Sequence, residues 1–149
     1  MTMDKVYIKI LIIDDDRGYR ITAARFFSTI GGHLVEVAEN GREGLKKAAQ
    51  LHPDIILLDM HMPDMTGLEV IEALSADAAM RDIPVILITG SSLDATERDS
   101  LKINYNFMRL EQKPVNFEKL LGIIETALQP GVTRPDKRKA VSGDSTEPT

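Results

Sequence analysis

Polar side chains that could do chemistry together follow four short apolar runs in this 149-residue chain. These residues are Asp14, Asp15, Asp16, Asp59, Thr89 and Lys113. Carboxylates that lie close together repel one another unless a cation neutralises them. Hard oxygen ligands suit Mg²⁺, which commonly bridges carboxylates to phosphate oxygens. The residue types therefore indicate a Mg²⁺ site that handles a phosphoryl group.

The same residues could accept that phosphoryl group covalently. A carboxylate can act as a nucleophile towards phosphorus and form an aspartyl phosphate. The transfer needs charge stabilisation by a metal and by an ammonium group, which Lys113 offers. The Thr89 hydroxyl could turn towards an added phosphoryl oxygen through a change of its χ1 angle. This chemistry requires all these groups to meet at one place in the fold.

Short apolar runs alternate with segments of helical period along the chain. Residues 8–13, 55–58 and 85–88 are nearly unbroken and β-branched, which is typical of strands buried on both faces. Residues 34–38 and 107–111 alternate between apolar and polar side chains, so we predict two edge strands there. Two sets of apolar residues recur at helical spacing and predict two helices. The first set is Tyr19, Ala23, Phe26, Phe27 and Ile30. The second set follows a predicted Asn116 N-cap and is Phe117, Leu120, Leu121, Ile124 and Leu128.

Five alternations of strand and helix predict an α/β fold with parallel strands joined by right-handed crossovers. With the second and fifth strands at the edges, the five-stranded sheet takes the doubly wound, flavodoxin-like order 2-1-3-4-5. The segment 92–101 is the weakest helix and is expected to be loosely held. Ligands of such sheets bind beyond the carboxyl ends of the strands, where Asp14 or Asp15 should share a crevice with Asp59.

Composition narrows the class of protein further. A net charge of -5 and a pI near 5.2 argue against direct nucleic-acid binding. The absence of cysteine excludes disulfides and suits a reducing cytoplasm, and no apolar run approaches the roughly 20 residues of a membrane span. We expect a cytoplasmic protein with one domain over residues 1–129, a disordered tail over residues 130–149 and no attached output domain.

Each chemical feature also has an ordinary structural explanation. A carboxylate after a buried strand is often a helix N-cap, which could account for one of the three consecutive aspartates. Asp59 could be a turn residue before Pro63, and Lys113 could be a surface lysine that precedes a proline. The remaining candidates are expected to be structural or to pack in loops: His33, His52, Met60, Met62 and Met65.

The segments IIDDDR, IILLDMHMPDMTG, VILITG and EQKP resemble, in this order, the signature segments of response-regulator receiver domains. The resemblance spans about residues 9–128. It implies that Asp14 and Asp15 hold Mg²⁺, directly or through water, together with Asp59 and a backbone carbonyl from His61. It also implies that Asp59 takes the phosphoryl group from a sensor histidine kinase or a histidine phosphotransfer protein.

The same resemblance assigns further roles around the phosphoacceptor. Thr89 and Lys113 would contact the phosphoryl group, and Gly67 would serve the turn after the acceptor loop. Lys113 and Pro114 would be joined by a cis peptide bond, which is otherwise uncommon.

Three positions depart from the common pattern of that family. Leu110 stands three residues before Lys113, where many members carry Tyr or Phe, so the usual aromatic readout is in question. Residues 106–108, Asn-Phe-Met, replace a Gly-Ala pair and leave the start of the fifth strand open. His61 is bulkier than the residue frequent at its position and is titratable, so it could tune the lifetime of the phosphoryl group.

The leading hypothesis is a phosphorylation switch, not an enzyme, that signals by binding a downstream effector protein. A haloacid-dehalogenase-type phosphatase would want a second aspartate where this chain has His61. A flavodoxin-like FMN carrier would want a hydroxyl- and glycine-rich loop where Asp14, Asp15 and Asp16 would repel the phosphate. A degenerate receiver that serves only for docking is disfavoured by the intact set of Asp14, Asp15, Asp59, Thr89 and Lys113.

Overall fold

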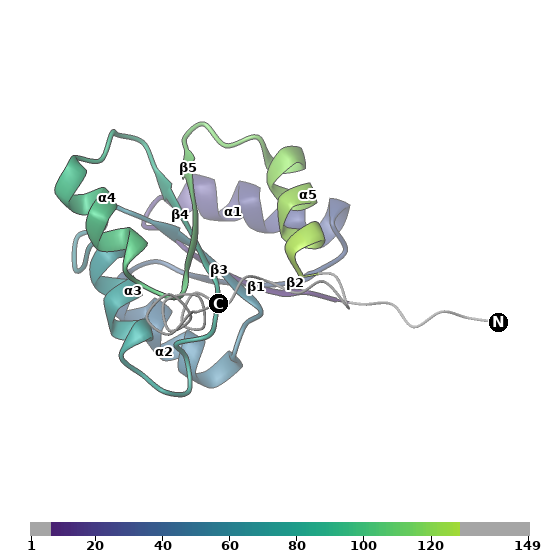
Figure 1. Ribbon diagram of the computed structural model, residues 1–149. Helices are drawn as coiled ribbons and strands as arrows, with labels where there is room; N and C mark the ends of the chain where they lie inside the picture. The colour runs from purple at the N-terminus through teal and green to yellow at the C-terminus, as the bar shows by residue number, and fades with distance from the viewer. Residues whose placement is uncertain (1–6, 129–149) are drawn as a thin grey trace, which may run out of the picture.

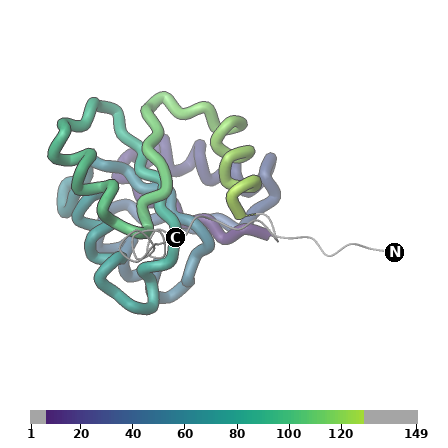
Figure 2. Tube along the Cα trace, viewed as in Figure 1, coloured from purple at the N-terminus to yellow at the C-terminus, as the bar shows by residue number. Residues whose placement is uncertain are grey.

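The computed structural model describes residues 7–128, so the predicted tail over residues 130–149 lies outside the described residues. Five parallel strands alternate with five α-helices, and the sheet order is β2-β1-β3-β4-β5. Figures 1 and 2 show the sheet with α1 and α5 on one side and α2, α3 and α4 on the other. The predicted fold class and strand order are confirmed. No helix within residues 7–128 has the length and apolarity needed to cross a membrane.

The three interior strands are apolar because helices cover both of their faces. They are β1 (Lys9–Ile13), β3 (Ile55–Asp59) and β4 (Val85–Thr89), and apart from Lys9 every residue in them is buried. Along β1, Leu11 and Ile13 pack towards α2, α3 and α4, whereas Ile10 and Ile12 pack towards α1 and α5. The edge strands β2 (Leu34–Ala38) and β5 (Phe107–Gln112) are half-exposed, as the alternating patterns predict.

Each α-helix begins with a side chain that accepts a hydrogen bond from the backbone of its first turn. The helices are α1 (Arg17–Arg25), α2 (Gly41–Leu51), α3 (Gly67–Ser75), α4 (Ala95–Lys102) and α5 (Phe117–Ala127), and their N-caps are Asp16, Asn40, Thr66, Asp94 and Asn116. The Asn116 cap is confirmed. Of the residues in α4 only Leu101 is buried, in keeping with its weak sequence pattern.

Two segments differ from the simplest sequence pattern. A π-helical turn, η1 (Phe26–Ile30), continues α1 and changes its register, so Ile30 is 68% exposed although helical spacing groups it with buried Phe27. In β5, Phe107 pairs with Val85 but Arg109 pairs with Ile86, which leaves one extra residue in the strand. The fifth strand therefore begins at Phe107 with an irregularity.

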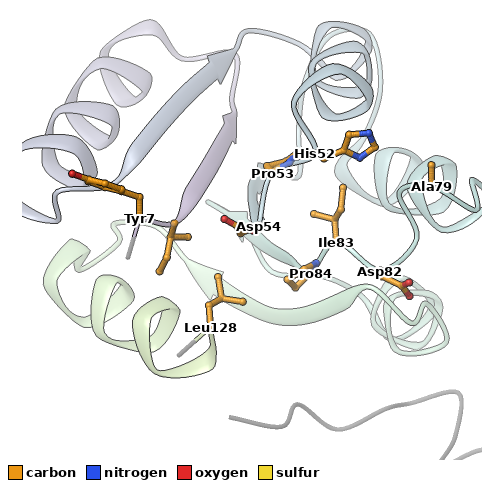
Figure 3. A pocket seen from close by; sticks show the side chains of 10 residues that line it. Tyr7, His52, Pro53, Asp54, Ala79, Asp82, Ile83, Pro84 and Leu128 are labelled. Atoms are coloured by element: carbon orange, nitrogen blue, oxygen red, sulfur yellow. The ribbon is translucent and has the colours of Figure 1, made fainter. Parts of the chain in front are cut away.

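The amino ends of the strands lie at the opposite end of the sheet from the predicted site, which is at the carboxyl ends. A pocket of about 470 Å³ opens there. Figure 3 shows the side chains that line it. Its lining includes Tyr7, Pro53, Asp54, Ile83, Pro84 and Leu128. None of the polar residues that the sequence singles out for phosphoryl chemistry lines it.

Candidate functional site

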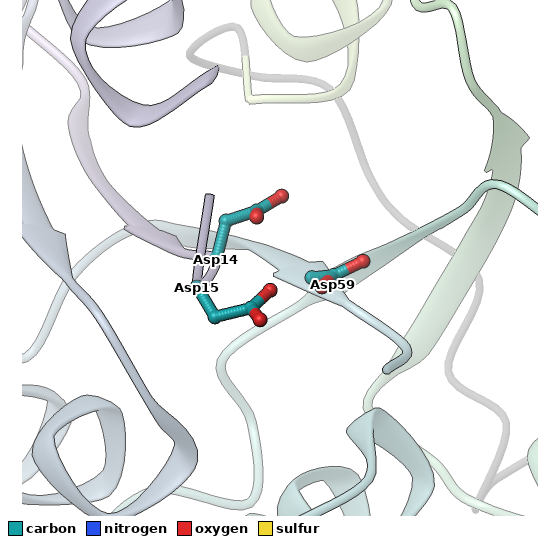
Figure 4. A group of neighbouring side chains, drawn as sticks. All are labelled: Asp14, Asp15 and Asp59. Carbon is teal, nitrogen blue, oxygen red and sulfur yellow. The ribbon is translucent and has the colours of Figure 1, made fainter. Parts of the chain in front are cut away.

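The carboxyl ends of β1 and β3 bring three aspartates together. Asp14 follows β1 directly and Asp59 is the last residue of β3, and these strands are paired neighbours. Asp14, Asp15 and Asp59 each offer a carboxylate oxygen, and these oxygens lie within 4.8 Å of one another. Figure 4 shows the three side chains gathered beyond the strand ends. The crevice expected from the sheet topology is therefore present.

Of the three consecutive aspartates, Asp16 caps a helix, whereas Asp14 and Asp15 belong to the acidic cluster. The Asp16 side chain accepts from the Tyr19 N–H at 3.2 Å and so caps α1. Asp14 is buried, and its Oδ1 accepts from the Asp16 N–H at 2.9 Å, which orients the carboxylate. Asp15 is exposed at the rim of the cluster. The helix-cap explanation thus applies to Asp16 alone.

Lys113 reaches into the cluster from the end of β5. Its Nζ lies 3.0 Å from Asp14 Oδ2 and 3.5 Å from Asp59 Oδ1. The same ammonium stands 4.6 Å from the centre of the Tyr19 ring, a cation–π distance. Its backbone N–H donates to the Thr89 carbonyl at 2.8 Å, and the peptide bond to Pro114 is cis, as the resemblance implies. Lys113 is therefore a partner of two buried carboxylates, not a simple surface lysine.

The proximity of these charges changes their pKa values. Burial raises the pKa of Asp59 to about 6, and the charge of Asp14 adds to this rise while Lys113 opposes it. Burial alone would lower the pKa of Lys113, but its hydrogen bond and charge interaction with Asp14, together with Asp59, raise that pKa above its ordinary value. The site contains three carboxylates but one ammonium, so part of the negative charge is not neutralised by Lys113. A bound cation would neutralise the rest, which favours cation binding at this site.

Thr89 ends β4, next to the end of β3, and is buried. Its Oγ1 donates to the Ser91 carbonyl at 3.1 Å and accepts from the Ser91 N–H at 3.2 Å. The four predicted positions, Asp14, Asp59, Thr89 and Lys113, thus stand at the same end of the sheet. The Thr89 hydroxyl is engaged by the following loop.

Comparison with known families accounts for this arrangement. The family model described as "Response regulator receiver domain" matches residues 10–125. The chain belongs to the response-regulator receiver family. Receiver domains are typically non-enzymatic phosphoacceptors that partner with a histidine kinase, and an acidic cluster such as Asp14, Asp15 and Asp59 is typical of their Mg²⁺ site. The phosphatase and FMN-carrier alternatives are therefore set aside.

Curated relatives of this receiver domain are longer proteins. It is 34% identical over 137 residues to the response regulator MprA of Mycolicibacterium vanbaalenii, and this alignment covers 87% of this chain and 53% of the relative. It is 32% identical over 108 residues to a protein-glutamate methylesterase/protein-glutamine glutaminase of Geobacillus kaustophilus, covering 72% of this chain and 30% of the relative. The chain spans about half or less of the length of these relatives.

Solved receiver structures match nearly over their full length. The chemotaxis protein CheY4 of Vibrio cholerae superposes with a TM-score of 0.74 at 28% identity, covering 83% of this chain and all of that one. A CheY-like receiver domain protein of Methanospirillum hungatei also gives a TM-score of 0.74 at 28% identity, with 83% of this chain and 94% of the other covered. The fold of this receiver is thus shared with single-domain CheY-like proteins.

Gly67 lies where the acceptor loop of the receiver meets the start of α3. A Cβ at this position would stand 2.6 Å from Leu87 Cδ1, 2.8 Å from the Asp59 carbonyl oxygen and 3.0 Å from Met60 Cα. Two of these three neighbours are backbone atoms, which cannot turn away. The absence of a side chain at Gly67 therefore allows α3 to start directly against the end of β3.

The expected structural residues behave as such. Met60 is buried in the core, and Met62 and Met65 pack against it. The ring of His33 accepts from the Ile8 N–H at 3.2 Å and contacts Glu125 at 2.8 Å, while His52 ends α2 in a left-handed conformation. These residues serve packing and chain geometry and lie outside the acidic cluster.

Two residues around the site were missed by the sequence reasoning. Tyr19, grouped only with the core helix pattern, presents its ring to Lys113, and its buried hydroxyl has no hydrogen-bond partner among the described residues. Burial, followed by the charges of Asp14 and Asp59, raises its pKa. Ser91 contacts both Thr89 and His61. Its position two residues after Thr89 was the only signal that could have pointed to it.

Proposed function

We propose that this receiver domain accepts a phosphoryl group on Asp59 in a Mg²⁺-dependent reaction and signals by binding a downstream effector protein. The observation that carries this proposal is the placement of the Lys113 ammonium between the buried carboxylates of Asp14 and Asp59. The donor would be the phosphohistidine of a sensor kinase or of a phosphotransfer protein. The bond from phosphorus to the donor nitrogen breaks as the bond from phosphorus to an Asp59 carboxylate oxygen forms.

Asp59 is the group best suited to be the nucleophile. It ends the central strand, and with a pKa of about 6 it is largely ionised near neutral pH. Asp14 is instead committed to Lys113 and to the Asp16 N–H, which together engage both of its oxygens. Of the two buried carboxylates in the cluster, Asp59 therefore has the freer oxygen.

The donor set fits a hard divalent cation. Asp14, Asp15 and Asp59 would hold Mg²⁺, directly or through water, together with the backbone carbonyl of His61. A bound Mg²⁺ would supply positive charge against the phosphoryl oxygens. Lys113 would supply the remaining charge from the β5 side, 3.5 Å from Asp59 Oδ1. In this role Lys113 orients the added group as well as neutralising it.

The added phosphoryl group is the signal itself. It brings roughly -1.5 to -2 charges into the crevice, which favours any hydroxyl or ammonium that can turn towards it. Thr89 would turn its hydroxyl from Ser91 towards a phosphoryl oxygen. The resulting change at the loops after β3 and β4 would alter the surface that the effector binds. We place this switch in the cytoplasm, where histidine kinases deliver their phosphoryl groups, with no direct role for nucleic acid or a membrane.

His61 would affect how long the phosphoryl group survives. The residue is exposed in the loop that follows Asp59. Its side chain would stand at the mouth of the site, where the attacking water must arrive. We expect the His61→Ala protein to lose its phosphoryl group at a different rate from the parent, measured by intact mass after the donor is removed. Equal rates would remove His61 from this role.

The test is phosphoryl uptake followed by intact-protein mass spectrometry. With acetyl phosphate and Mg²⁺ the parent should gain one hydroxylamine-labile phosphoryl group, and a chelator should prevent this. Asp59→Asn should gain none, whereas Asp54→Asn, at the other end of β3, should match the parent. Labelling of the Asp59→Asn protein at the parent rate, or equal labelling of the parent in chelator, would overturn the proposal.

A further inference from the structure

The hydroxyl of Thr89 makes its described hydrogen bonds with a single residue, Ser91. Thr89 Oγ1 donates to the Ser91 carbonyl at 3.1 Å and accepts from the Ser91 N–H at 3.2 Å. Thr89 itself is only 1% exposed, so water does not readily replace these partners. A turn of the hydroxyl towards a phosphoryl group on Asp59 must therefore break both bonds with Ser91.

The side chain of Ser91 continues this connection across the site. Its Oγ lies 3.1 Å from Nε2 of His61, which belongs to the loop after β3. The backbone of His61 pairs with Thr66, and Thr66 forms the capping box at the start of α3 with Glu69. The loop after β4 is thus tied to the loop after β3 through one side-chain hydrogen bond. That bond ends on a residue whose own backbone is anchored at α3.

The loop after β4 is exposed, with open space around Gly90. Residues 90–92 are all exposed and lie between buried Thr89 and buried Leu93. A Cβ at Gly90 would meet no atom within 4 Å. Leu110, on the other side of β4, is aliphatic and offers no hydrogen-bonding side chain that could follow Thr89. The described hydrogen bonds of the Thr89 side chain therefore lead to Ser91, and from the Ser91 side chain to His61.

We infer that Ser91 and His61 are positioning residues for Thr89. In the unphosphorylated domain the His61–Ser91 hydrogen bond holds the loop after β4 where Ser91 engages the Thr89 hydroxyl. Phosphorylation of Asp59 draws that hydroxyl away and releases the loop from His61. The inference rests on the proposed function, and it places the first structural response between the loops that follow β3 and β4.

The amide of Ser91 reports directly on this arrangement because its hydrogen-bond acceptor is the Thr89 hydroxyl. Its protection from hydrogen exchange, corrected for the intrinsic rate of each sequence, can be measured by NMR in the full chain. We expect Ser91→Ala and His61→Ala each to reduce this protection in the unphosphorylated protein by about two- to tenfold, the factor that one neutral hydrogen bond supplies. Phosphorylation of the parent should reduce it by at least as much.

Matched variants separate this coupling from general loosening. Ser92→Ala alters the neighbouring exposed residue of the same loop and should leave the protection of amide 91 unchanged, and Ser91→Thr should retain it by keeping a hydroxyl. The double variant Ser91→Ala/His61→Ala should equal either single variant, because both remove the same bond. Phosphoryl uptake from acetyl phosphate should rise by a similar factor in both single variants, since Thr89 is then freer to turn.

The outcomes distinguish failure of the positioning role of Ser91 and His61 from failure of phosphorylation on Asp59. Normal phosphorylation of Asp59 with unchanged protection of the Ser91 amide would overturn the positioning role while leaving the proposed function intact. Additive effects in the double variant, or an effect of Ser92→Ala equal to that of Ser91→Ala, would also overturn it. A parent chain that takes up no phosphoryl group on Asp59 would overturn the proposed function and the release together.

Discussion

Strand β3 has an aspartate at each end, and the two carboxylates lie in opposite surroundings. Asp54 precedes the strand at the amino end, where it is exposed beside the pocket of Figure 3 and accepts from the Lys9 N–H at 2.8 Å. Asp59 ends the strand, is 6% exposed and lies 3.5 Å from Lys113 Nζ. Burial and the neighbouring carboxylates raise the pKa of Asp59 to about 6.

A lysine accompanies the aspartate at each end, which makes the comparison sharper. Lys9 Nζ donates to the Leu51 carbonyl at 3.3 Å in an exposed setting. Lys113 Nζ instead contacts two buried carboxylates. At the carboxyl end the chain leaves β1 and β3 towards opposite faces of the sheet, which opens a crevice where polar groups converge. The same two residue types therefore lie in different surroundings at the two ends of the strand, so residue type indicates chemistry only together with the strand end at which it stands.

The largest effect should come from removing the lysine at the carboxyl end. In metal-free buffer near pH 7.5, Lys113→Ala leaves Asp14 and Asp59 without their ammonium partner, so the free energy of unfolding should fall by roughly 3 kcal/mol. Lys9→Ala should change it by less than about 0.5 kcal/mol. Urea unfolding followed by circular dichroism measures both. Similar losses in the two variants would remove the distinction between the two ends.

Close packing at the carboxyl end predicts the next effect. Gly67→Ala would place a methyl group against the backbone of Asp59 and Met60, which should lower the free energy of unfolding by about 1–3 kcal/mol. Gly90→Ala is the matched control, because its methyl group would enter open space. Urea unfolding is again the measurement, and a Gly67→Ala protein as stable as Gly90→Ala would show that the start of α3 adjusts freely.

The affinity for Mg²⁺ should depend on the exposed member of the cluster. Asp15→Ala should weaken Mg²⁺ binding by about tenfold, because one of three carboxylates is lost from the donor set. Asp54→Ala, at the amino end, should leave the affinity unchanged. Isothermal titration of the unphosphorylated proteins tests this comparison. Equal affinities of Asp15→Ala and Asp54→Ala would place the cation elsewhere.

The smallest effect concerns pH. The pKa of Asp59 in the folded domain exceeds its ordinary value of 3.8, so the protonated form favours folding and this stability is lost as pH rises through about 6. In metal-free buffer, Asp59→Asn should therefore gain more stability over the parent at pH 8 than at pH 5, by a difference on the order of 1 kcal/mol. Asp54→Asn provides the control. A gain that is equal at both pH values would show that the pKa of Asp59 is not raised.

Much of the fold followed from the sequence because parallel interior strands must be apolar on both faces. That pattern located β3 and β4. It therefore placed Asp59 and Thr89 at the carboxyl ends of these strands, where the structure also has them. The half-exposed pattern of residues 34–38 and 107–111 likewise identified the edges and hence the strand order. The exposure of Ile30 was beyond this reasoning, since a π-helical turn changes the register that helical spacing assumes.

Local patterns were enough to predict which residues stand at the carboxyl ends of the interior strands and which side chain caps α5, because periodicity and N-capping depend on neighbours a few positions away. The folded chain, in contrast, shows that Asp16 caps a helix while Asp14 contacts Lys113, 99 residues further along the chain. It also shows that Ser91 joins Thr89 to His61. Such contacts depend on how two separate loops are placed over the sheet, and no local pattern encodes that placement.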